Sequence, residues 1–392
     1  MLHTAVAYAL PPLQLYIELT AENGVLKLPA GHYAGPAVIT KPITIEAEPG
    51  AEVIIDGEGN ATVISIQSDN VVIRGLHITG SGDSFDGVDA GILLEADKVI
   101  IENNTIDNVL FGINLKSANE NIVRNNVISS MPVKTAMRGD GVRLWNSHDN
   151  LIESNKIERV RDVYITNSSD NRFINNHISQ SKIGFQLVFS HENEISGNTI
   201  TDNGTGILLF YSNNLLIKEN RISHLRNFSG TALAFKESNG VVVRDNEILH
   251  CSNGLTANSP VHPENILNLI NNQFTYNDVA LYFYGEKGGH IIEGNRFEQN
   301  IVDVRVSAVA TTSGNIWKNN YWDTYRGFDL NYDGIGDTPY ELYLYSDRIW
   351  MDRPGTQFFR GSPAMEFIDF VERLTSYSKP NLVLKDAQPK VN

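Results

Sequence analysis

The chain has one cysteine, few basic residues and no long hydrophobic run. Cys251 is the only cysteine in 392 residues, so no disulfide can form within the chain. A large repeat protein does not need one, and the compartment stays open on this ground. No stretch approaches the roughly 18 to 20 apolar residues of a membrane-spanning helix. Lys and Arg number 31 against 46 Asp and Glu, for a net charge of −15, which disfavours nucleic acid as a partner because phosphates bind clustered cations.

The first nine residues look like the end of an export signal. Residues 5–9 end in a small-x-small triplet, and Leu10-Pro11-Pro12 follows. Such a triplet precedes the cleavage site of secretory signals, whose basic and apolar regions would be missing here. We therefore expect an exported protein, with an ordinary disordered N-terminus as the alternative.

One asparagine-centred motif recurs ten times along the chain. Each copy has an Asn, a variable residue and an apolar or aromatic residue, and the copies start at Asn104, Asn126, Asn155, Asn176, Asn198, Asn220, Asn246, Asn272, Asn295 and Asn320. The steps between successive Asn residues are 22, 29, 21, 22, 22, 26, 26, 23 and 25. A repeat of this length indicates a solenoid in which each coil packs on its neighbours.

The repeat predicts an all-β fold, a right-handed parallel β-helix of roughly 11 to 12 coils. Short alternating stretches such as residues 206–209 read as strands, and one of them usually begins eight residues after the Asn. A single coil cannot bury its apolar face, so coils must stack about 4.8 Å apart. Because an amide has both donors and an acceptor, stacked Asn side chains can bond from coil to coil. Leucine-rich and helical repeats would show Leu or Ala at their repeated positions instead.

Both ends of the repeat need caps, since an open strand edge invites association. An amphipathic helix is expected at residues 13–20, and Ser362-Pro363 is expected to start a C-terminal helix. The expected segments are residues 1–9 (signal remnant or disordered), 10–78 (N-terminal cap and irregular first coils), 79–322 (regular coils), 323–345 (a metal-loop segment) and 346–392 (a docking segment whose end, from Tyr377, is a flexible tail).

The sequence resembles the NosD family of accessory proteins for nitrous oxide reductase maturation. The residues that carry the resemblance are 228–250, 251–265, 278–290, 320–341 and 346–363. The resemblance implies a periplasmic protein without a catalytic site, held at the inner membrane by the permease of an ABC transporter and its ATPase. It further implies that a membrane-anchored copper chaperone donates copper, which is supplied to nitrous oxide reductase.

Residues 329–337 match the first part of a calcium loop. Oxygen-bearing side chains stand at positions 1, 3, 5 and 9, and position 7 offers a main-chain carbonyl, so the expected ligands are Asp329, Asn331, Asp333, Ile335 and Asp337. Hard oxygen ligands suit calcium and not copper. Glu341 falls one residue late for position 12, and an Asp/Asn/Gly-rich turn without metal is the alternative.

Copper would need imidazole, thioether or thiolate ligands. His224 and His250 each lie four residues after a motif Asn, so they should occupy one position on adjacent coils, about 5 Å apart. Tyr276 takes that position on the next coil, and Cys251 adjoins His250. We expect the two imidazoles to form a copper site, in either oxidation state; two surface or core histidines without metal are the alternative.

A second copper candidate lies in the longest insertion, residues 130–139. It contains Met131 and Met137, whose thioethers suit transient Cu(I) handover; local packing is the alternative.

Four further histidines fall into two pairs. His262 and His290 lie in enlarged turns of neighbouring coils, as weaker candidates for a ligand pair or a docking surface. His148 and His191 share a position two coils apart, roughly 10 Å, which is too far to share a metal.

A polysaccharide-binding or polysaccharide-modifying β-helix, such as a lyase or epimerase, is the alternative function. Asp140 and Asp162 start successive coils with Arg138 and Arg161 close by, and paired carboxylates can do acid–base work. Such a protein requires a groove lined by aromatic and basic residues. No clear His/Tyr/Arg constellation is evident, so a surface Asp–Arg ladder is expected and no catalytic site.

Overall fold

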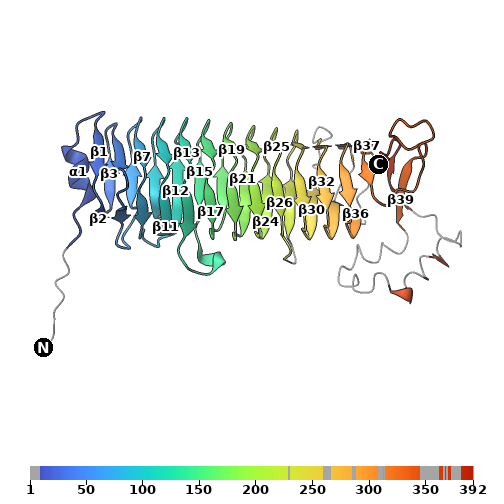
Figure 1. The fold of residues 1–392 in the computed structure, drawn as a ribbon, viewed down its shortest axis with the longest axis horizontal. Helices are drawn as coiled ribbons and strands as arrows, with labels where there is room; N and C mark the ends of the chain where they lie inside the picture. Colours follow the sequence, from blue (N-terminus) through green and yellow to red (C-terminus); the bar gives the residue numbers. More distant parts are fainter. Residues whose placement is uncertain are drawn as a thin grey trace. The chain divides into compact units, whose positions relative to one another are not determined.

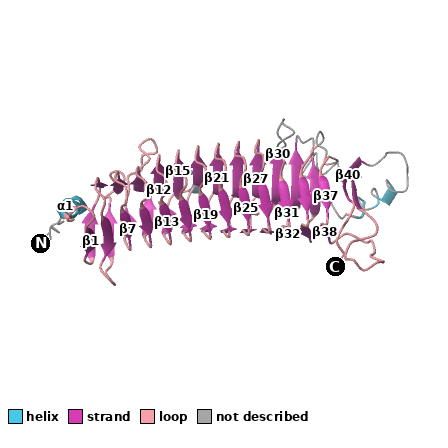
Figure 2. Ribbon diagram, turned by 90° about the horizontal axis from the view of Figure 1, so that it is seen from above, coloured by secondary structure: helices cyan, strands magenta, loops and turns pink. Residues whose placement is uncertain are grey.

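The computed structural model describes residues 9–227, 230–258, 266–284, 288–307, 312, 314–344, 362–364, 367, 370–371 and 381–391. The chain divides into two compact units, residues 1–199 and 200–392. Both are built almost entirely from short strands, as Figures 1 and 2 show. The strands of each unit form three parallel sheets wound as a right-handed parallel β-helix, with about 12 turns in all. The predicted fold class is confirmed.

Unit 1 begins with helix α1 (Leu13–Leu19), whose Leu13 and Ile17 are buried. Each following coil contributes one strand to each sheet. The first sheet contains β1 (Val25–Leu28), β4 (Thr44–Ala47), β7 (Val72–Arg74), β10 (Ile100–Glu102), β13 (Ile122–Arg124), β16 (Leu151–Glu153), β19 (Arg172–Ile174) and β22 (Glu194–Ser196). The second contains β2 (Gly31–Ala34), β5 (Val53–Asp56), β8 (His77–Thr79), β11 (Thr105–Val109), β14 (Val127–Ser130), β17 (Lys156–Glu158) and β20 (His177–Ser179).

The third sheet of unit 1 contains β3 (Ala37–Ile39), β6 (Ile64–Ile66), β9 (Ala90–Leu94), β12 (Phe111–Lys116), β15 (Val142–Trp145), β18 (Val163–Thr166) and β21 (Ile183–Val188). The short helix η1 (Thr135–Met137) lies in the long insertion before β15, and β23 (Thr199–Thr201) lies at the boundary of the units.

Unit 2 repeats this plan. Its first sheet contains β25 (Leu216–Lys218), β28 (Val242–Arg244), β31 (Asn268–Ile270), β34 (Ile291–Glu293), β37 (Ile316–Lys318), β40 (Asn381–Asp386) and β39 (Tyr340–Leu344). Its second contains β26 (Arg221–Ser223), β29 (Glu247–Leu249), β32 (Gln273–Thr275), β35 (Arg296–Glu298) and β38 (Tyr321–Trp322). Its third contains β24 (Thr205–Phe210), β27 (Thr231–Lys236), β30 (Asn253–Asn258), β33 (Val279–Tyr284) and β36 (Val302–Val306).

Stacked apolar side chains form the core of each unit. In the first sheet of unit 1, Ile101 pairs with Val123 and Val123 pairs with Ile152, and all three are buried. Their sequence neighbours point outward because successive residues of a strand alternate between its faces. The strand register therefore brings equivalent positions of successive coils into contact. The alternation of inward and outward residues is the period-2 pattern from which the strands were predicted.

The first coils are regular, which corrects the expectation of irregular coils within residues 10–78. β1, β4 and β7 pair in parallel without a register shift, and so do β2, β5 and β8. These coils lack the Asn motif, so sequence periodicity missed them. Stacking of buried apolar residues such as Ile45 and Ile73 is sufficient to set the register there.

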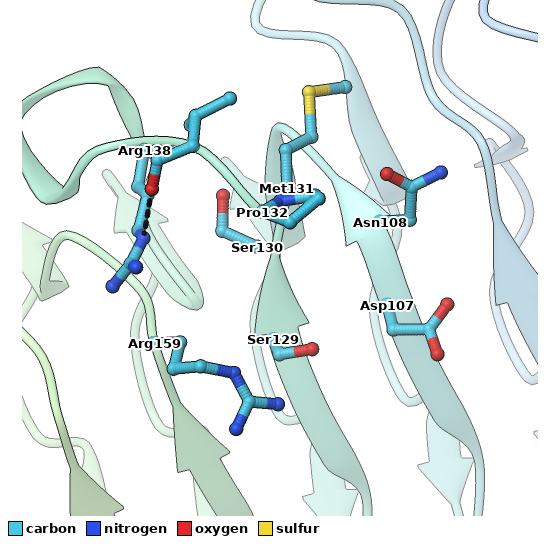
Figure 3. A pocket seen from close by; sticks show the side chains of 9 residues that line it. Asp107, Asn108, Ser129, Ser130, Met131, Pro132, Arg138 and Arg159 are labelled. Carbon is cyan, nitrogen blue, oxygen red and sulfur yellow. Dashed lines mark hydrogen bonds between the residues drawn. The ribbon is translucent and has the colours of Figure 1, made fainter.

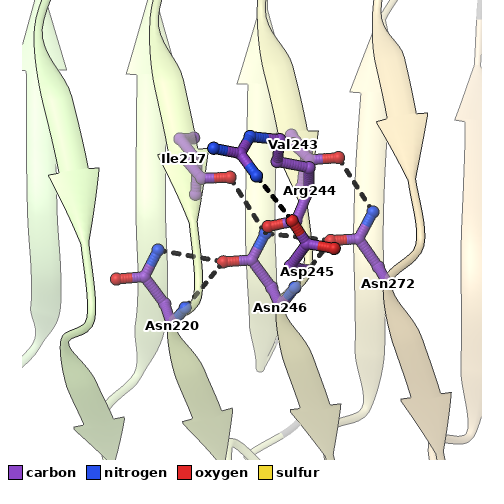
Figure 4. Close-up of polar contacts among 7 residues, drawn as sticks. All are labelled: Ile217, Asn220, Val243, Arg244, Asp245, Asn246 and Asn272. Carbon is purple, nitrogen blue, oxygen red and sulfur yellow. Dashed lines mark hydrogen bonds and ion pairs between the residues drawn. The ribbon is translucent and has the colours of Figure 1, made fainter.

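The motif asparagines form the predicted ladder inside the turn between the first and second strands of each coil. In unit 1, Nδ2 of Asn104 donates to Oδ1 of Asn126 at 3.0 Å, and the pattern continues through Asn155, Asn176 and Asn198 at 3.0 to 3.1 Å. In unit 2 the same bonds, at 2.9 to 3.1 Å, join Asn220, Asn246, Asn272, Asn295 and Asn320, three of which appear in Figure 4. Oδ1 of a ladder Asn also accepts the backbone N–H of the residue one coil earlier, as Asn155 does from Asn126 and Asn272 does from Asn246.

Unit 1 contains a second amide ladder that sequence reasoning missed. Asn121 donates to Asn150, Asn150 to Asn171, and Asn171 to Asn193, at 2.9 to 3.2 Å. Each of these residues stands five positions before a motif Asn, a spacing that recurs in four consecutive coils and would have revealed the ladder.

The end of the chain closes the last coil of unit 2. β40 pairs antiparallel with β39 and adds in parallel beside β37, where Asp386 lies opposite Trp317. The expectation of a flexible tail from residue 377 is wrong for residues 381–391. The physical reason is that the last coil leaves open an edge and an unpaired amide ladder, and this segment satisfies both.

The expected C-terminal helix lies largely outside the described residues, as does Trp350. Residues 363–364, 367 and 370–371 are helical, and Phe367 and Phe370 are exposed. The first eight residues also lie outside the described part. In the described part of the chain, no helix combines the length and hydrophobicity that a membrane crossing requires.

Candidate functional sites

Three aromatic side chains stack on the outside of unit 2, each following a strand of the second sheet. The ring centroids of His224 and His250 lie 5.3 Å apart at 28°, and those of His250 and Tyr276 lie 5.1 Å apart at 7°. All three residues have a positive φ, between 53° and 61°, so the same turn presents each ring. The prediction that His224 and His250 lie next to each other on adjacent coils is confirmed.

The surroundings of His250 favour a neutral imidazole. Partial burial lowers its pKa, and the nearby charges of His224 and Arg226 lower it further. Arg226 is held in place, because it pairs with Asp278 at 3.2 Å and donates to the carbonyl of Tyr276 at 2.8 Å. A neutral imidazole is the form that binds metals.

The stacked rings are neighbours but do not converge on one point. The lone pairs of an imidazole lie in the ring plane, so two nearly parallel rings direct them side by side. Both histidines would bind one copper ion only after a ring turns, and His224 is exposed and has room to do so. The pair is therefore an adaptable contact for copper and not a rigid cage.

Cys251 does not belong to this surface. Its side chain is buried, and its thiol donates to the carbonyl of Leu249 at 3.3 Å. Burial raises the pKa of the Cys251 thiol to about 12, so the metal-binding thiolate does not form at neutral pH. Although the two residues are adjacent in sequence, the turn after β29, in which His250 has φ +53°, leaves the imidazole at the surface and buries the thiol.

Met131 lines a hollow of about 460 Å³ on unit 1, shown in Figure 3. Its neighbours include Asp107, Asn108, Arg138 and Arg159. A second hollow, which also contains acidic side chains, shares Met131 and Asn108. The side chain of Met131 also packs on a small core cluster, so it is partly buried. The predicted partner, Met137, is 60% exposed and does not line either hollow.

His290 is a core residue and not an exposed turn ligand, which corrects its candidacy. It is buried, its Nδ1 accepts the N–H of Leu267 at 3.1 Å, and its own N–H donates to Asn315 at 3.1 Å. It stands five residues before Asn295, the position that the second ladder uses in unit 1. The other proposed member of the pair, His262, lies outside the described residues.

His148 also serves the coil structure. Its Nδ1 accepts the N–H of Ser169 at 3.1 Å, and the hydroxyl of Ser169 accepts the N–H of His191 at 3.1 Å. Ser169 therefore links the two histidines from the intervening coil, in keeping with the prediction that they are too far apart to share a metal.

The Asp140–Asp162 pair is buried, which corrects the expectation of a surface ladder. The two residues are 0% and 4% exposed. Arg161 donates to Asp140 at 2.9 and 3.0 Å and lies 3.5 Å from Asp162, whereas Arg138 donates to the carbonyls of Val133 and Gln180. The turns that precede β15 and β18 point both carboxylates inward, away from solvent.

Burial shapes the titration of this pair. Desolvation raises the pKa of Asp140 to about 6, helped by the charge of Asp162 and opposed by Arg161. Desolvation also raises the pKa of Asp162. One oxygen of each carboxylate has no hydrogen-bond partner among the described residues. Perturbed carboxylates mark catalytic sites in some proteins and buried ion-pair networks in others, and the burial here matches the second case.

The calcium-like loop is closed by its own backbone. Asp329 accepts the N–H groups of Asp333 and Gly334 at 3.2 and 2.8 Å, and Asp333 accepts that of Ile335 at 2.8 Å. Asp337 accepts the N–H of Leu330 at 2.6 Å. Gly334 has φ +82°, as the sharp turn at position 6 requires.

The chemistry of this loop suits a hard cation, but its acidic side chains are not gathered around one point. Asn331 turns its amide nitrogen toward Asp333 at 2.9 Å, an arrangement that hydrogen bonding alone explains. Within the described ranges, no group of three or more His, Cys, Asp or Glu side chains is arranged to hold a metal ion. Calcium binding therefore stays a prediction.

Sequence reasoning missed a basic and aromatic surface on the third sheet of unit 1. Asn114, Lys116, Arg143 and Trp145 line a hollow there together with Val88. These residues stand at the outward positions of alternating strands. A sequence search for the core considers only the inward positions and therefore passes over them.

Comparisons with known proteins agree on the family. Residues 129–327, about half of the chain, match the family described as periplasmic copper-binding protein (NosD). A protein of Pseudomonas aeruginosa named "Probable ABC transporter binding protein NosD" is 25% identical, over 90% of this chain and 84% of its own. Its namesake from Stutzerimonas stutzeri is 25% identical over 88% and 82%.

Solved structures share the fold at low identity. A PL6 alginate lyase in complex with a trisaccharide aligns with a TM-score of 0.60 and 15% identity, over 79% of this chain and 81% of that chain. This likeness concerns the β-helix alone, because so low an identity carries no function with it. The match over residues 129–327 shows that the chain belongs to the NosD family.

Proposed function

We propose that this chain is a non-enzymatic periplasmic protein that receives copper and passes it on during maturation of nitrous oxide reductase. Family membership supports the proposal, since the family is described as periplasmic and copper-binding. Two relatives carry a name that associates them with an ABC transporter. Copper is the cargo here and not a resident cofactor.

The stacked pair His224–His250 is the observation that carries the copper role. Two imidazoles on adjacent coils, one of them with a lowered pKa, offer two nitrogen ligands at the surface of unit 2. Cu(I) accepts two or three soft or borderline ligands. A site that needs a ring rotation binds less tightly than a preformed one, and cargo must be released again.

Copper titration of the wild type and the double variant His224→Ala/His250→Ala tests this role. We expect the double variant to lose one equivalent of bound copper or at least about tenfold in affinity. His32→Ala/His177→Ala is the matched control, because those histidines are also accessible but belong to unit 1 and not to the stack. Unchanged stoichiometry and affinity in the double variant would remove the pair from the account.

Met131 is proposed as a transient Cu(I) contact during transfer from a membrane-anchored copper chaperone. A thioether that lines a surface hollow is accessible to a donor protein, and Met137 offers a second thioether in the same insertion. Met131→Leu keeps the volume of the side chain, so we expect a slower transfer rate with an unchanged fold. An unchanged transfer rate in Met131→Leu would remove this contact.

The C-terminal segment is proposed to hold the protein on the permease of an ABC transporter, whose ATPase works inside the cell. Exposed Phe367 and Phe370 support this role. Truncation after Arg360 would also delete β40 and uncap unit 2, so it confuses docking with stability. Phe367→Ser/Phe370→Ser keeps β40, and co-purification from native membranes should then fall. Retained co-purification with the permease would refute this docking mode.

A polysaccharide-modifying enzyme is the rival function. The basic and aromatic hollow of unit 1 favours it, whereas the burial of Asp140 and Asp162 disfavours acid–base work by these carboxylates. Incubation with uronan polymers decides the matter through two products, unsaturated ends or epimerised sugars. We expect neither.

A further inference from the structure

The outer face of the third sheet in unit 1 carries two rows of side chains that the copper role does not use. The inward residues of β12, β15 and β18 fill the core, so the alternate residues point out. The register places Asn114, Arg143 and Tyr164 in one row and Lys116, Trp145 and Thr166 in the next.

Arg143 is a partly buried cation that lies near two aromatic rings. Its guanidinium carbon lies 5.6 Å from the ring centre of Phe111 and 5.8 Å from that of Tyr164. It makes no hydrogen bond or ion pair with any of the described residues, although Asp140 lies near enough to feel its charge. A guanidinium has five donors in a fixed plane, and this one is positioned to bind a carboxylate through two of them.

Within the described part of the chain, Arg143 lacks a hydrogen-bond acceptor, whereas Oδ1 of Asn114 lacks a donor. The residue is 5% exposed, and its buried Oδ1 has no hydrogen-bond partner among the described residues. A buried acceptor without a donor is costly, so turning the amide toward the hollow and accepting from a ligand hydroxyl or N–H group would be favourable. Asn114 and Arg143 are paired across adjacent strands, so one ligand can contact both.

The other side chains of the hollow complete the set. The indole of Trp145 is 42% exposed and offers a flat apolar surface. Lys116 lies opposite Trp145 in the register and is paired with Glu95 at 2.7 Å, so it adds positive charge that is already partly neutralised. Among the described residues, neither the cation nor the acceptor in this hollow has a hydrogen-bond partner, and the indole of Trp145 adds a flat aromatic surface beside them.

We propose that this hollow binds a uronate unit of an acidic oligosaccharide. A sugar acid carries a carboxylate for Arg143, hydroxyl donors for Oδ1 of Asn114 and a C–H ring face for Trp145, all on one ring. A simple anion satisfies only Arg143, and a neutral sugar leaves Arg143 without an acceptor. The site belongs to unit 1 and the histidine stack to unit 2, so this binding function stands or falls independently of copper handling.

Isothermal titration of the full chain with a trimer of mannuronate tests the proposal. We expect saturable binding, with maltotriose and sodium acetate each at least about tenfold weaker, because each supplies only part of the contact set. Absence of mannuronate binding at millimolar concentrations would overturn the proposal. Acetate or maltotriose binding as tightly as the uronate would overturn it as well, since the site would then recognise a bare anion or a neutral sugar.

Substitutions locate the binding to this hollow. Arg143→Met should weaken uronate binding by about tenfold or more, because it removes the bidentate cation. The matched control is Arg172→Met, an outward arginine of the first sheet that is paired with Glu194 at 3.1 Å, and it should bind as the wild type does. If Arg143→Met folds poorly, Trp145→Ala tests the same hollow and should also weaken uronate binding. Unchanged affinity in a folded Arg143→Met or Trp145→Ala variant would refute the site.

Discussion

The carboxylate of Asp386 takes the place of the next asparagine after Asn320. Oδ2 of Asp386 accepts from Nδ2 of Asn320 at 3.0 Å and from its backbone N–H at 3.2 Å, which are the two bonds that a ladder Asn accepts elsewhere. It also accepts from Nε1 of Trp322 at 3.2 Å. A segment 66 residues further along the chain therefore ends the amide ladder of unit 2.

Removing this cap should destabilise unit 2. In Asp386→Ala, the buried donors of Asn320 and Trp322 lose their acceptor, which costs roughly 2–4 kcal/mol of unfolding free energy. Asp386→Asn keeps an acceptor oxygen of the same shape, so its loss should be clearly smaller. Urea unfolding measures both variants. Equal stability of Asp386→Ala and the wild type would mean that the cap does not support the last coil.

A substitution inside the ladder should be more damaging than one on the surface. Asn246→Ala breaks the bonds with Asn220 and Asn272 that Figure 4 shows and leaves buried groups unpaired, at a cost of about 3 kcal/mol or more. The control is Glu247→Ala, next in sequence, which loses only the exposed pair with Arg221 and should cost less than about 1 kcal/mol. Thermal unfolding of the two variants should separate them widely; similar losses would contradict a stabilising ladder.

The buried Asp140 should make stability depend on pH in an unusual direction. Its pKa is raised from 3.8 to about 6 on folding, chiefly by desolvation, so the folded state binds the proton more tightly than the unfolded state. The resulting stabilisation is complete below the unfolded value and is lost as the pH rises through 6. Relative to Asp140→Asn, the wild type should lose on the order of 2–3 kcal/mol between about pH 4 and pH 7.

Chemical unfolding of both proteins across this pH range measures that difference. The comparison with Asp140→Asn removes the titrations that the two proteins share. A difference that stays constant with pH, or that grows in favour of the wild type, would show that Asp140 is not desolvated in the folded protein.

Calcium should stabilise the loop at residues 329–337 if the loop binds it. After chelation, added calcium should raise the melting temperature, because a ligand that binds only the folded state shifts the equilibrium toward it. Asp329→Ala/Asp333→Ala should abolish the shift, while Asp323→Ala, outside the loop, should keep it. A melting temperature that calcium leaves unchanged would identify the loop as a hydrogen-bonded turn without metal.

Periodic features of the sequence predicted neighbours in space correctly. The spacing of the motif asparagines placed Asn246 between Asn220 and Asn272, and the common offset of four residues placed His224 on His250. Both predictions work because a β-helix converts a fixed offset from the ladder into a fixed position on the coil.

Features without a period escaped prediction. Asp386 joins the ladder from a distant segment, so the spacing of the motif asparagines does not predict its position. The burial of Asp140 depends on how one turn points its side chain, and residue type alone suggests the surface. Arg143 and Trp145 were overlooked because the alternating pattern identifies the inward residues of the core and says nothing about the role of the outward ones.

X-ray absorption of the copper-loaded protein distinguishes histidine ligands from sulfur ligands. In the wild type we expect nitrogen ligation with the multiple-scattering signature of imidazole. That signature should disappear in His224→Ala/His250→Ala and persist in His32→Ala/His177→Ala. Copper bound only by sulfur in the wild type, or an imidazole signature that survives in the double variant, would contradict the assignment of the histidine stack as the copper contact.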